Sequence, residues 1–323
     1  LNLFLETKNP IINYRGVLIP VKNIKVYIDF LSVIKSDPII KKINFVLDEL
    51  DISQLNKLSI IIKPSNFKSL LNNKIKEGSM ISEIDIFLNE QGSLKDFIAK
   101  GSVRNLKAEL YENFNLKKTN LSFFADRKDI LIKNINGELE DIKITEGDIK
   151  LNFENGIKFN SNFNSKLDLN EKILKKYFKL FDKNKAAMGL KNLKADLNNN
   201  IYIDFDNTYK VKDYNYNISG NLEKSRYSLS QPFKNIFLKE KIKEINLIDM
   251  QIKTTFSPKK TKFKSKGKYS FNNSDFLKIN IENNIHNELI NLKLDADYSG
   301  NLEIGLINYK KTKGAISNLL TDI

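Results

Sequence analysis

The amino-acid sequence predicts a mostly-β protein, an extended, curved antiparallel sheet that forms an apolar groove, with a few short amphipathic helices. The main observation behind this prediction is the alternation of apolar and polar residues in segment after segment from about Met80 to Leu306. A two-residue period places the two classes on opposite faces of a sheet. A second observation is glycine in the apolar register at Gly137, Gly220 and Gly267, where it permits the bends that let a wide sheet curl.

Residues 1–79 predict a mixed segment of strands and short helices, unlike the rest of the chain. Alternating apolar residues indicate strands, and apolar residues at helical spacing indicate helices. The elements expected there, in order, are a strand over 21–28, a helical turn over 30–34, a strand over 43–47 and short helices over 53–62 and 65–75.

Two stretches of consecutive strands, over 80–169 and 191–323, are expected to form the groove. An amphipathic helix is inserted between them at 170–190, where Asn170 supplies the side chain of an N-cap. A further short helix is expected over 233–243. The strands are expected around residues 84–88, 97–103, 106–110, 130–132, 149–153, 157–169, 193–197, 201–205, 214–218, 250–252, 263–271, 279–281, 292–294 and 302–306.

Composition limits the classes of function. The 323 residues include 53 Lys or Arg and 39 Asp or Glu, which gives a formal net charge of +14. Such an excess fits an anionic partner; it fits equally the Lys-, Asn- and Ile-rich composition that an AT-rich genome favours. The chain has no cysteine and one histidine, His286, so we expect no disulfide, metal site or cofactor. No apolar run reaches the length of a transmembrane helix. Since residue 1 is Leu1, we expect a leader or membrane anchor outside this chain.

A row of lysines at every second position, Lys260, Lys262, Lys264, Lys266 and Lys268, is the most concentrated charge in the sequence. On a strand, all five ammonium groups project from one face. That face could contact lipid headgroups or another anionic surface. The alternative is an ordinary solvated sheet face whose lysines prevent edge-to-edge aggregation. Nucleic-acid binding is not expected, because arginine is scarce and no nucleic-acid-binding motif is present.

The segment 201–208, Ile-Tyr-Ile-Asp-Phe-Asp-Asn-Thr, resembles the first motif of haloacid-dehalogenase-type phosphotransferases. In that resemblance Asp204 would be the nucleophile and Asp206 the acid/base. The motif requires a following helix in a parallel sheet, and a polar strand end followed by a turn explains the same residues. We therefore expect no enzyme, and we assign no catalytic residue.

The apolar stripes of the strands have two possible roles. In an ordinary sandwich they form a core that a second sheet covers. In an open, curved sheet they line a groove, and an apolar surface of that size needs a ligand or a partner. Parity along the strands predicts that six residues face into such a groove, namely Ile149, Leu151, Phe153, Phe159, Leu292 and Leu294.

Several segments resemble the AsmA-like proteins of Gram-negative bacteria, including relatives with DUF3971-type regions and TamB-like members. The strand, short turn and strand over 21–55 are similar to that family's early repeat. The strand–glycine–strand segments Ile-Asn-Gly-Glu-Leu (135–139), Glu-Gly-Asp-Ile (146–149) and Tyr-Asn-Ile-Ser-Gly-Asn-Leu (216–222) are similar to its later repeats. The resemblance covers most of the chain.

The resemblance implies a membrane-associated periplasmic protein of outer-membrane biogenesis. Such a protein would carry phospholipid between the inner and outer membranes along an apolar β groove, without catalysis. The usual inner-membrane anchor helix would lie outside this chain. The alternative is a scaffold that binds polypeptide and assists the assembly of outer-membrane or surface proteins.

Overall fold

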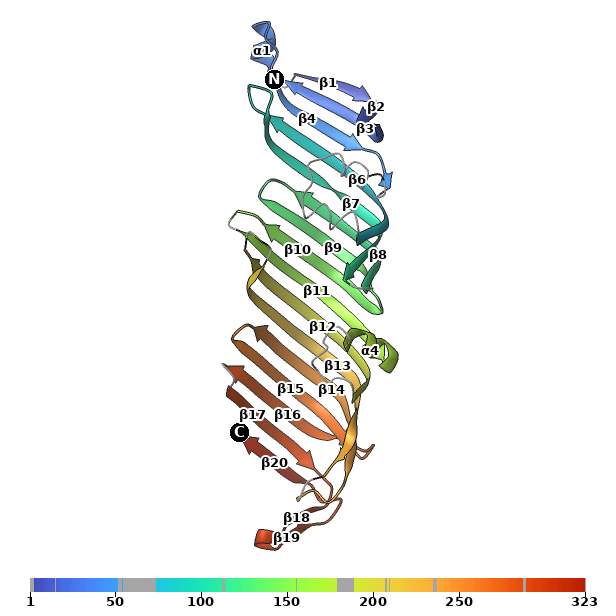
Figure 1. Ribbon diagram of the computed structural model, residues 1–323, viewed down its shortest axis with the longest axis vertical. Helices are drawn as coiled ribbons and strands as arrows, with labels where there is room; N and C mark the ends of the chain where they lie inside the picture. Colours follow the sequence, from blue (N-terminus) through green and yellow to red (C-terminus); the bar gives the residue numbers. More distant parts are fainter. Residues whose placement is uncertain are drawn as a thin grey trace. The chain divides into compact units, whose positions relative to one another are not determined.

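The computed structural model describes residues 3–14, 16–51, 54, 74–111, 114–154, 156–178, 189–206, 208, 210–234, 237–286 and 289–322. It confirms the predicted fold class, since 18 of the described strands join into one antiparallel sheet and helices are few (Figure 1). By its internal contacts the chain divides into unit 1, residues Leu1–Phe163 with Asp204–Lys210, and unit 2, residues Asn164–Ile203 with Val211–Ile323.

Unit 1 is a sheet in which neighbours in the chain are mostly neighbours in space. Strands β1 and β2 both pair with β3, β4 pairs with β3 and β6, and β5 pairs beside β4 on β6. From β6 to β10 each strand pairs with the next. The strands are β1 (Leu3–Lys8), β2 (Ile11–Tyr14), β3 (Val17–Ile28), β4 (Ile40–Leu47), β5 (Leu50–Asp51), β6 (Ile75–Leu88), β7 (Leu94–Tyr111), β8 (Phe114–Ala125), β9 (Asp129–Leu139) and β10 (Ile142–Asn152), followed by β11 (Ile157–Asn170), which enters unit 2.

Unit 2 continues the same up-and-down order. Strands β13 to β17 pair consecutively, and β20 pairs with β17. Strands β18 and β19 form a separate hairpin. The strands are β12 (Leu190–Phe205), β13 (Val211–Phe233), β14 (Ile242–Ser257), β15 (Lys260–Phe271), β16 (Leu277–His286), β17 (Leu289–Tyr298), β18 (Leu302–Ile304), β19 (Tyr309–Lys311) and β20 (Ser317–Asp322).

Three short helices interrupt the described strands: α1 (Phe30–Ile34), α4 (Glu171–Phe178) and the 3-10 turn η3 (Gly305–Ile307). The predicted turn over 30–34 is confirmed as α1, whose amides donate to the Asp29 carboxylate. The predicted N-cap of α4 is confirmed as well, because Asn170 Oδ1 accepts from the Ile173 N–H at 3.1 Å. The Lys175 and Lys191 ammonium groups hold the pKa of Glu171, the first residue of α4, at about 2.

The other helices and the domain boundary expected from the sequence are not confirmed by the structure. The helices expected over 53–62 and 65–75, and the second half of the insertion at 170–190, lie mainly outside the described residues. The helix expected over 233–243 is wrong in its described part. Strand β13 runs to Phe233, Leu238 makes a single β-bridge with Leu302, and β14 begins at Ile242. The boundary expected after residue 79 falls inside β6.

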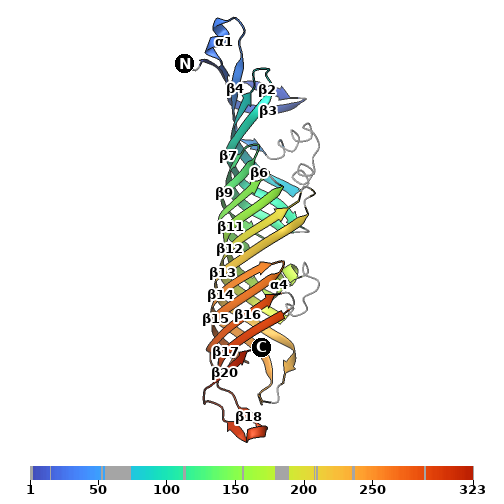
Figure 2. The same cartoon turned by 90° about the vertical axis from the view of Figure 1, so that its left-hand side faces the viewer.

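Aligned β-bulges shape the middle of unit 1. One residue in each of β7, β8, β9 and β10 has left-handed backbone, at Asn105, Lys118, Asn134 and Glu146, with φ between 48° and 56°. A bulge leaves backbone N–H groups without a partner in the ladder, and side chains on neighbouring strands accept hydrogen bonds from them. Asn120 Oδ1, for example, accepts a hydrogen bond from the Asn105 N–H at 3.1 Å. A bulge adds one residue and increases local twist. The row therefore bends adjacent strands together, and Figure 2 shows that the strands of each unit curl rather than lie flat.

Glycine allows close packing beside this row. Gly137 on β9 lies under Thr119 of β8, which is fully buried. A Cβ atom at Gly137 would come within 2.1 Å of Thr119 Oγ1 and 3.0 Å of its Cα. The glycine that the sequence placed in the apolar register is thus required by the neighbouring strand.

Gly137→Ala should therefore destabilise the protein by roughly 1–3 kcal/mol, the usual cost of overpacking a tight site. Urea unfolding followed by circular dichroism measures this cost. The matched control is Gly305→Ala, whose Cβ would meet no atom within 4 Å, and we expect it to change stability by less than about 0.5 kcal/mol. Equal stabilities for the two variants would contradict the proposed packing.

Candidate functional site: an apolar sheet face

Strand register brings the apolar residues of unit 2 onto one face. Ile252 of β14 pairs with Ser265 of β15, Ser265 with Ile281 of β16, and Ile281 with Leu294 of β17. Directly opposed residues in antiparallel strands lie on the same face. A neighbouring row on that face has Gly267, Ile279, Ala296 and Leu319 in register.

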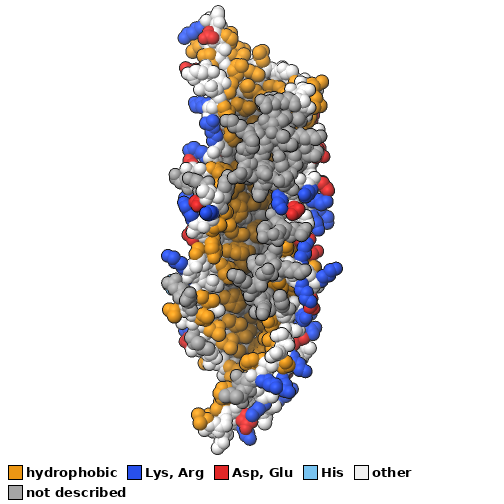
Figure 3. Space-filling view, in the orientation of Figure 1, with side chains coloured by type: hydrophobic (Ala, Val, Ile, Leu, Met, Phe, Trp, Pro, Cys, Tyr) orange, Lys and Arg blue, Asp and Glu red, His pale blue; other side chains and the backbone are white. Residues whose placement is uncertain are grey.

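A hollow of about 330 Å³ opens on this apolar face. Its walls are almost entirely hydrocarbon, and it takes residues from β13, the β13–β14 connection, β14, β15, β16, β17 and β20. The lining residues are Leu229, Phe233, Leu238, Ile242, Ile245, Tyr269, Phe271, Ile279, Leu294, Ala296 and Leu319. Such a hollow fits an apolar ligand better than a polar one. In Figure 3 hydrophobic side chains gather over the middle of these strands, and Lys and Arg side chains lie at the margins.

Beside the hollow, a small cluster is buried between the strands. Ala195, Leu222 and Met250 are nearly inaccessible, and partly buried neighbours such as Leu247 and Ile279 pack against them. Most other apolar residues of the described strands are only partly buried. The apolar face is therefore not a closed core, because much of it remains open to solvent.

Several polar groups within the apolar face are hydrogen-bonded, whereas Asn283 Oδ1, opposite Leu292, is buried without a partner among the described residues. Asn199 Nδ2 donates to Ser165 Oγ at 2.8 Å, and Tyr216 Oη donates to Asn199 Oδ1 at 2.8 Å. Burial raises the pKa of Tyr216, so this hydroxyl stays protonated. Tyr269 Oη donates to the Asp297 carbonyl at 2.7 Å, and burial raises its pKa to about 12. Buried polar atoms satisfied in this way do not oppose an apolar ligand.

The register places five of the six predicted groove residues on the apolar faces. Leu292 and Leu294 pair with Asn283 and Ile281 in unit 2, and Leu294 lines the hollow. In unit 1, Ile149 and Leu151 pair with the apolar residues Ile132 and Ile130 of β9, and Phe159 lies on β11 in phase with the buried Ser161 and Ser165. Phe153 differs, because it follows the end of β10 and its amide donates to the Lys128 carbonyl in a turn.

Sequence parity missed the residues that close one end of the hollow. They come from the end of β13, the connection that follows it and the start of β14, and are Leu229, Phe233, Leu238, Ile242 and Ile245. Part of this segment was expected to be a helix. The alternation of Tyr227 and Leu229 with serines, in phase with the buried Ser225 of β13, is the signal that could have identified this strand end.

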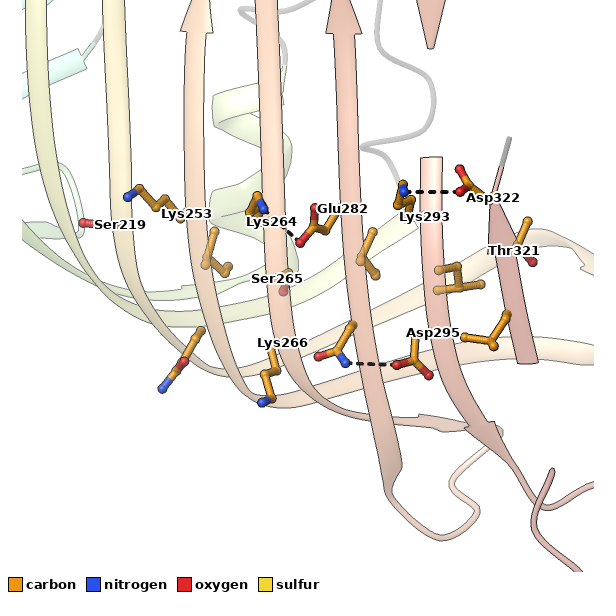
Figure 4. Close-up of a pocket in the computed structure, with 16 residues that line it drawn as sticks. Ser219, Lys253, Lys264, Ser265, Lys266, Glu282, Lys293, Asp295, Thr321 and Asp322 are labelled. Carbon is orange, nitrogen blue, oxygen red and sulfur yellow. Dashed lines mark hydrogen bonds and ion pairs between the residues drawn. The ribbon is translucent and has the colours of Figure 1, made fainter. Parts of the chain in front are cut away.

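The lysine row lies on the opposite face of the sheet from the hollow. Thr261, Phe263 and Ser265 alternate with the lysines and face the apolar side, so Lys260 to Lys268 face away from it. Two of them, Lys264 and Lys266, border a hollow of about 880 Å³ on the polar face, where Lys264 pairs with Glu282 at 2.9 Å and Lys293 with Asp322 at 3.2 Å (Figure 4). Lys260 lowers the pKa of Lys262 by repulsion. A ligand in the middle of the apolar face is therefore not beside these ammonium groups.

The dehalogenase-like segment lacks the structural context of its motif. Asp204 lies near the end of β12, and the antiparallel strand β13 follows rather than a helix. The Asp206 carboxylate accepts from the Thr208 amide at 2.7 Å and from the Lys210 amide at 3.0 Å, as in a side-chain-stabilised turn. Among the residues that the structure describes, no group of three or more His, Cys, Asp or Glu side chains could hold a metal ion.

Comparison of the chain with protein-family models, with curated proteins and with solved structures finds no match. Within the described part of the chain, no helix has the length and hydrophobicity needed to span a bilayer.

The apolar hollow should bind a neutral apolar fluorophore such as N-phenyl-1-naphthylamine. Leu294→Glu places a carboxylate in its wall and should weaken this binding at least about tenfold, because a charge resists an apolar environment. Fluorescence titration measures the affinity. The control Asn291→Glu adds the same charge to the opposite face of β17 and should leave binding unchanged; equal losses in both variants would refute the assignment.

Proposed function

We propose that the protein is a non-enzymatic carrier of phospholipid whose acyl chains lie against the apolar faces of the sheet. The observation that carries this proposal is the hydrocarbon-lined hollow of about 330 Å³ on a face that no second described sheet covers. The only other described sheet is the short β18–β19 hairpin. A sandwich would instead cover such a face with a second layer about 10 Å away.

The energetics of acyl chains favour this occupant. Each buried methylene of a lipid contributes roughly 0.8 kcal/mol, so a chain gains affinity by length of contact rather than by specific polar bonds. The faces of both units supply such contact, with apolar rows that repeat from strand to strand. Headgroups would remain in water at the margins, where Figure 3 shows Lys and Arg side chains. Movement along the face needs no catalytic residue.

The place of this activity follows from the resemblance to AsmA-like proteins and is part of the proposal. In it the protein acts in the periplasm of a Gram-negative bacterium, anchored to the inner membrane through a segment outside this chain. It carries phospholipid to the outer membrane and so contributes to outer-membrane biogenesis. Curled strands and one apolar face per unit support this proposal.

A second candidate is a scaffold that binds polypeptide and assists the assembly of outer-membrane or surface proteins. One observation favours it. Strand β20 pairs with β17 on one side, and no described strand pairs with its other side. An exposed edge can accept an extended peptide as an added strand. The scaffold would bind its partner through backbone hydrogen bonds at this edge, whereas the carrier binds through its apolar face.

The mass of the molecule that co-purifies with the chain distinguishes the two functions. Native mass spectrometry of the chain should detect bound phospholipid, and the double variant Leu151→Glu with Leu292→Glu should lose it, because one carboxylate then interrupts the apolar face of each unit. The control, Lys133→Glu with Asn291→Glu, adds at least as much negative charge at exposed positions on the opposite faces and should retain lipid. A lipid-free protein, or lipid retained in the first variant, would reject the carrier.

A further inference from the structure

The hairpin of β18, η3 and β19, residues 302–311, forms a sharply turned tip on unit 2 (Figure 1). Its strands pair in register from Leu302 with Lys311 to Ile304 with Tyr309. Asn308 has left-handed backbone, with φ of 52°, and its amide donates to the Gly305 carbonyl at 3.2 Å. The chain therefore reverses within a few residues. We refer to residues 302–311 as the tip hairpin.

The base of the tip hairpin is fixed to the body of unit 2. Leu302 is buried and bridges to Leu238, and the Glu303 amide donates to the Phe237 carbonyl at 3.0 Å. Lys311 is buried too. Its Nζ donates to the Gly300 carbonyl at 2.7 Å and to the Ala315 carbonyl at 2.5 Å, and it lies 5.2 Å from the centre of the Tyr298 ring. A buried ammonium needs such partners, so these bonds hold the hairpin in one position.

The outer end of this anchored hairpin is apolar and exposed. The side chains there are Leu306, 96% exposed, Ile307, 66% exposed, and Tyr309, 43% exposed. Single exposed apolar residues are common and need no explanation. A cluster of three exposed apolar side chains within four residues, at the end of a fixed hairpin, does need an explanation, because it stabilises the fold little.

Three lysines lie on or beside the base of the tip hairpin, near Asn301 and Glu303. Lys310 and Lys313 have largely exposed side chains, and Lys239 is about half exposed. Glu303 pairs with Lys239 at 2.9 Å and with Lys310 at 3.4 Å, and these two ammonium groups lower its pKa. Since Lys313 pairs only loosely with Glu240, at 3.8 Å, the described surroundings of the tip keep an excess of positive charge.

We propose that the tip hairpin docks on the surface of an anionic phospholipid bilayer. Leu306 and Ile307 enter the acyl region, Tyr309 lies at the interface, and Lys239, Lys310 and Lys313 face the headgroup phosphates. Interfacial tyrosine and flanking lysine are typical of membrane-contacting segments. A stable protein partner would require about 800 Å² of surface on this side, which a protruding tip of three apolar residues does not offer. A bilayer accepts a small convex wedge.

This docking goes beyond lipid carriage and does not depend on it, because it needs no occupant on the apolar face. The two proposals can therefore fail separately. A change at the tip should leave co-purifying lipid unchanged, and a change on the apolar face should leave docking unchanged.

The chain contains no tryptophan, so Leu306→Trp introduces a single indole that reports insertion. Its emission should shift to shorter wavelength when vesicles of phosphatidylglycerol and phosphatidylcholine are added. The control Leu320→Trp replaces a leucine that is 76% exposed on β20, and its emission should not shift. An unshifted Leu306→Trp spectrum, or equal shifts in both variants, would overturn the proposal.

Vesicle co-sedimentation tests the affinity. Leu306→Asp with Ile307→Asp should weaken binding to the phosphatidylglycerol-containing vesicles at least about tenfold, while Leu320→Asp should bind like the unmodified chain. The unmodified chain should also bind phosphatidylcholine vesicles at least about tenfold more weakly, because the lysines lose their anionic partners. Undiminished binding by the double variant, or equal binding to both vesicles, would overturn the proposal.

Discussion

Antiparallel pairing in a fixed register determines which side chains of this protein share a face. In a strand, a shift of one residue would move every apolar side chain to the other face. The bulges in unit 1 show how the register is preserved. Each adds one residue, so the apolar residues change from a spacing of two to a spacing of three, as from Val103 to Leu106 on β7 and from Ile132 to Ile135 on β9. Because β7 to β10 all carry a bulge, their apolar residues stay on one face across the row.

The two faces consequently have different chemistry. One face of unit 2 carries the hydrocarbon hollow, while the other carries lysines that partly pair with carboxylates across strands, such as Lys264 with Glu282. Exposed pairs of this kind contribute little stability, and Lys253 opposite Lys264 is a pair of like charges. The charged face keeps the sheet in water, and the apolar face remains available for a ligand.

Much of the fold could be predicted from the sequence because period-two alternation is a local signal. The strands at 43–47, 149–153 and 279–281, and the helical turn at 30–34, have structural counterparts in β4, β10, β16 and α1. The bulge positions were not identified from the sequence, because the left-handed residues, such as Lys118 and Glu146, are not glycines and their signal is only a change in the spacing of apolar residues. The helix expected over 233–243 failed because a short apolar stretch does not distinguish a helix turn from two strand ends.

The site was only partly predictable, because alternation identifies residues within regular strands but not residues in the connections between them. Parity identified Leu292 and Leu294, which lie in a regular strand, but it could not identify Leu238, which reaches the hollow from a connection between strands. Phe153 was assigned by extending the alternation of β10 one step past its end. The lysine row was visible in the sequence, but its position opposite the hollow required the cross-strand register.

The central claim is that lipid, rather than protein, occupies the apolar face. The most direct measurement is photo-crosslinking in cells from p-benzoylphenylalanine at Ile281, which faces the apolar side, and at its neighbour Asn280, which faces the polar side. The account predicts an adduct of lipid mass at residue 281 and none at residue 280. Adducts of protein mass at residue 281, or no lipid adduct there, would contradict it.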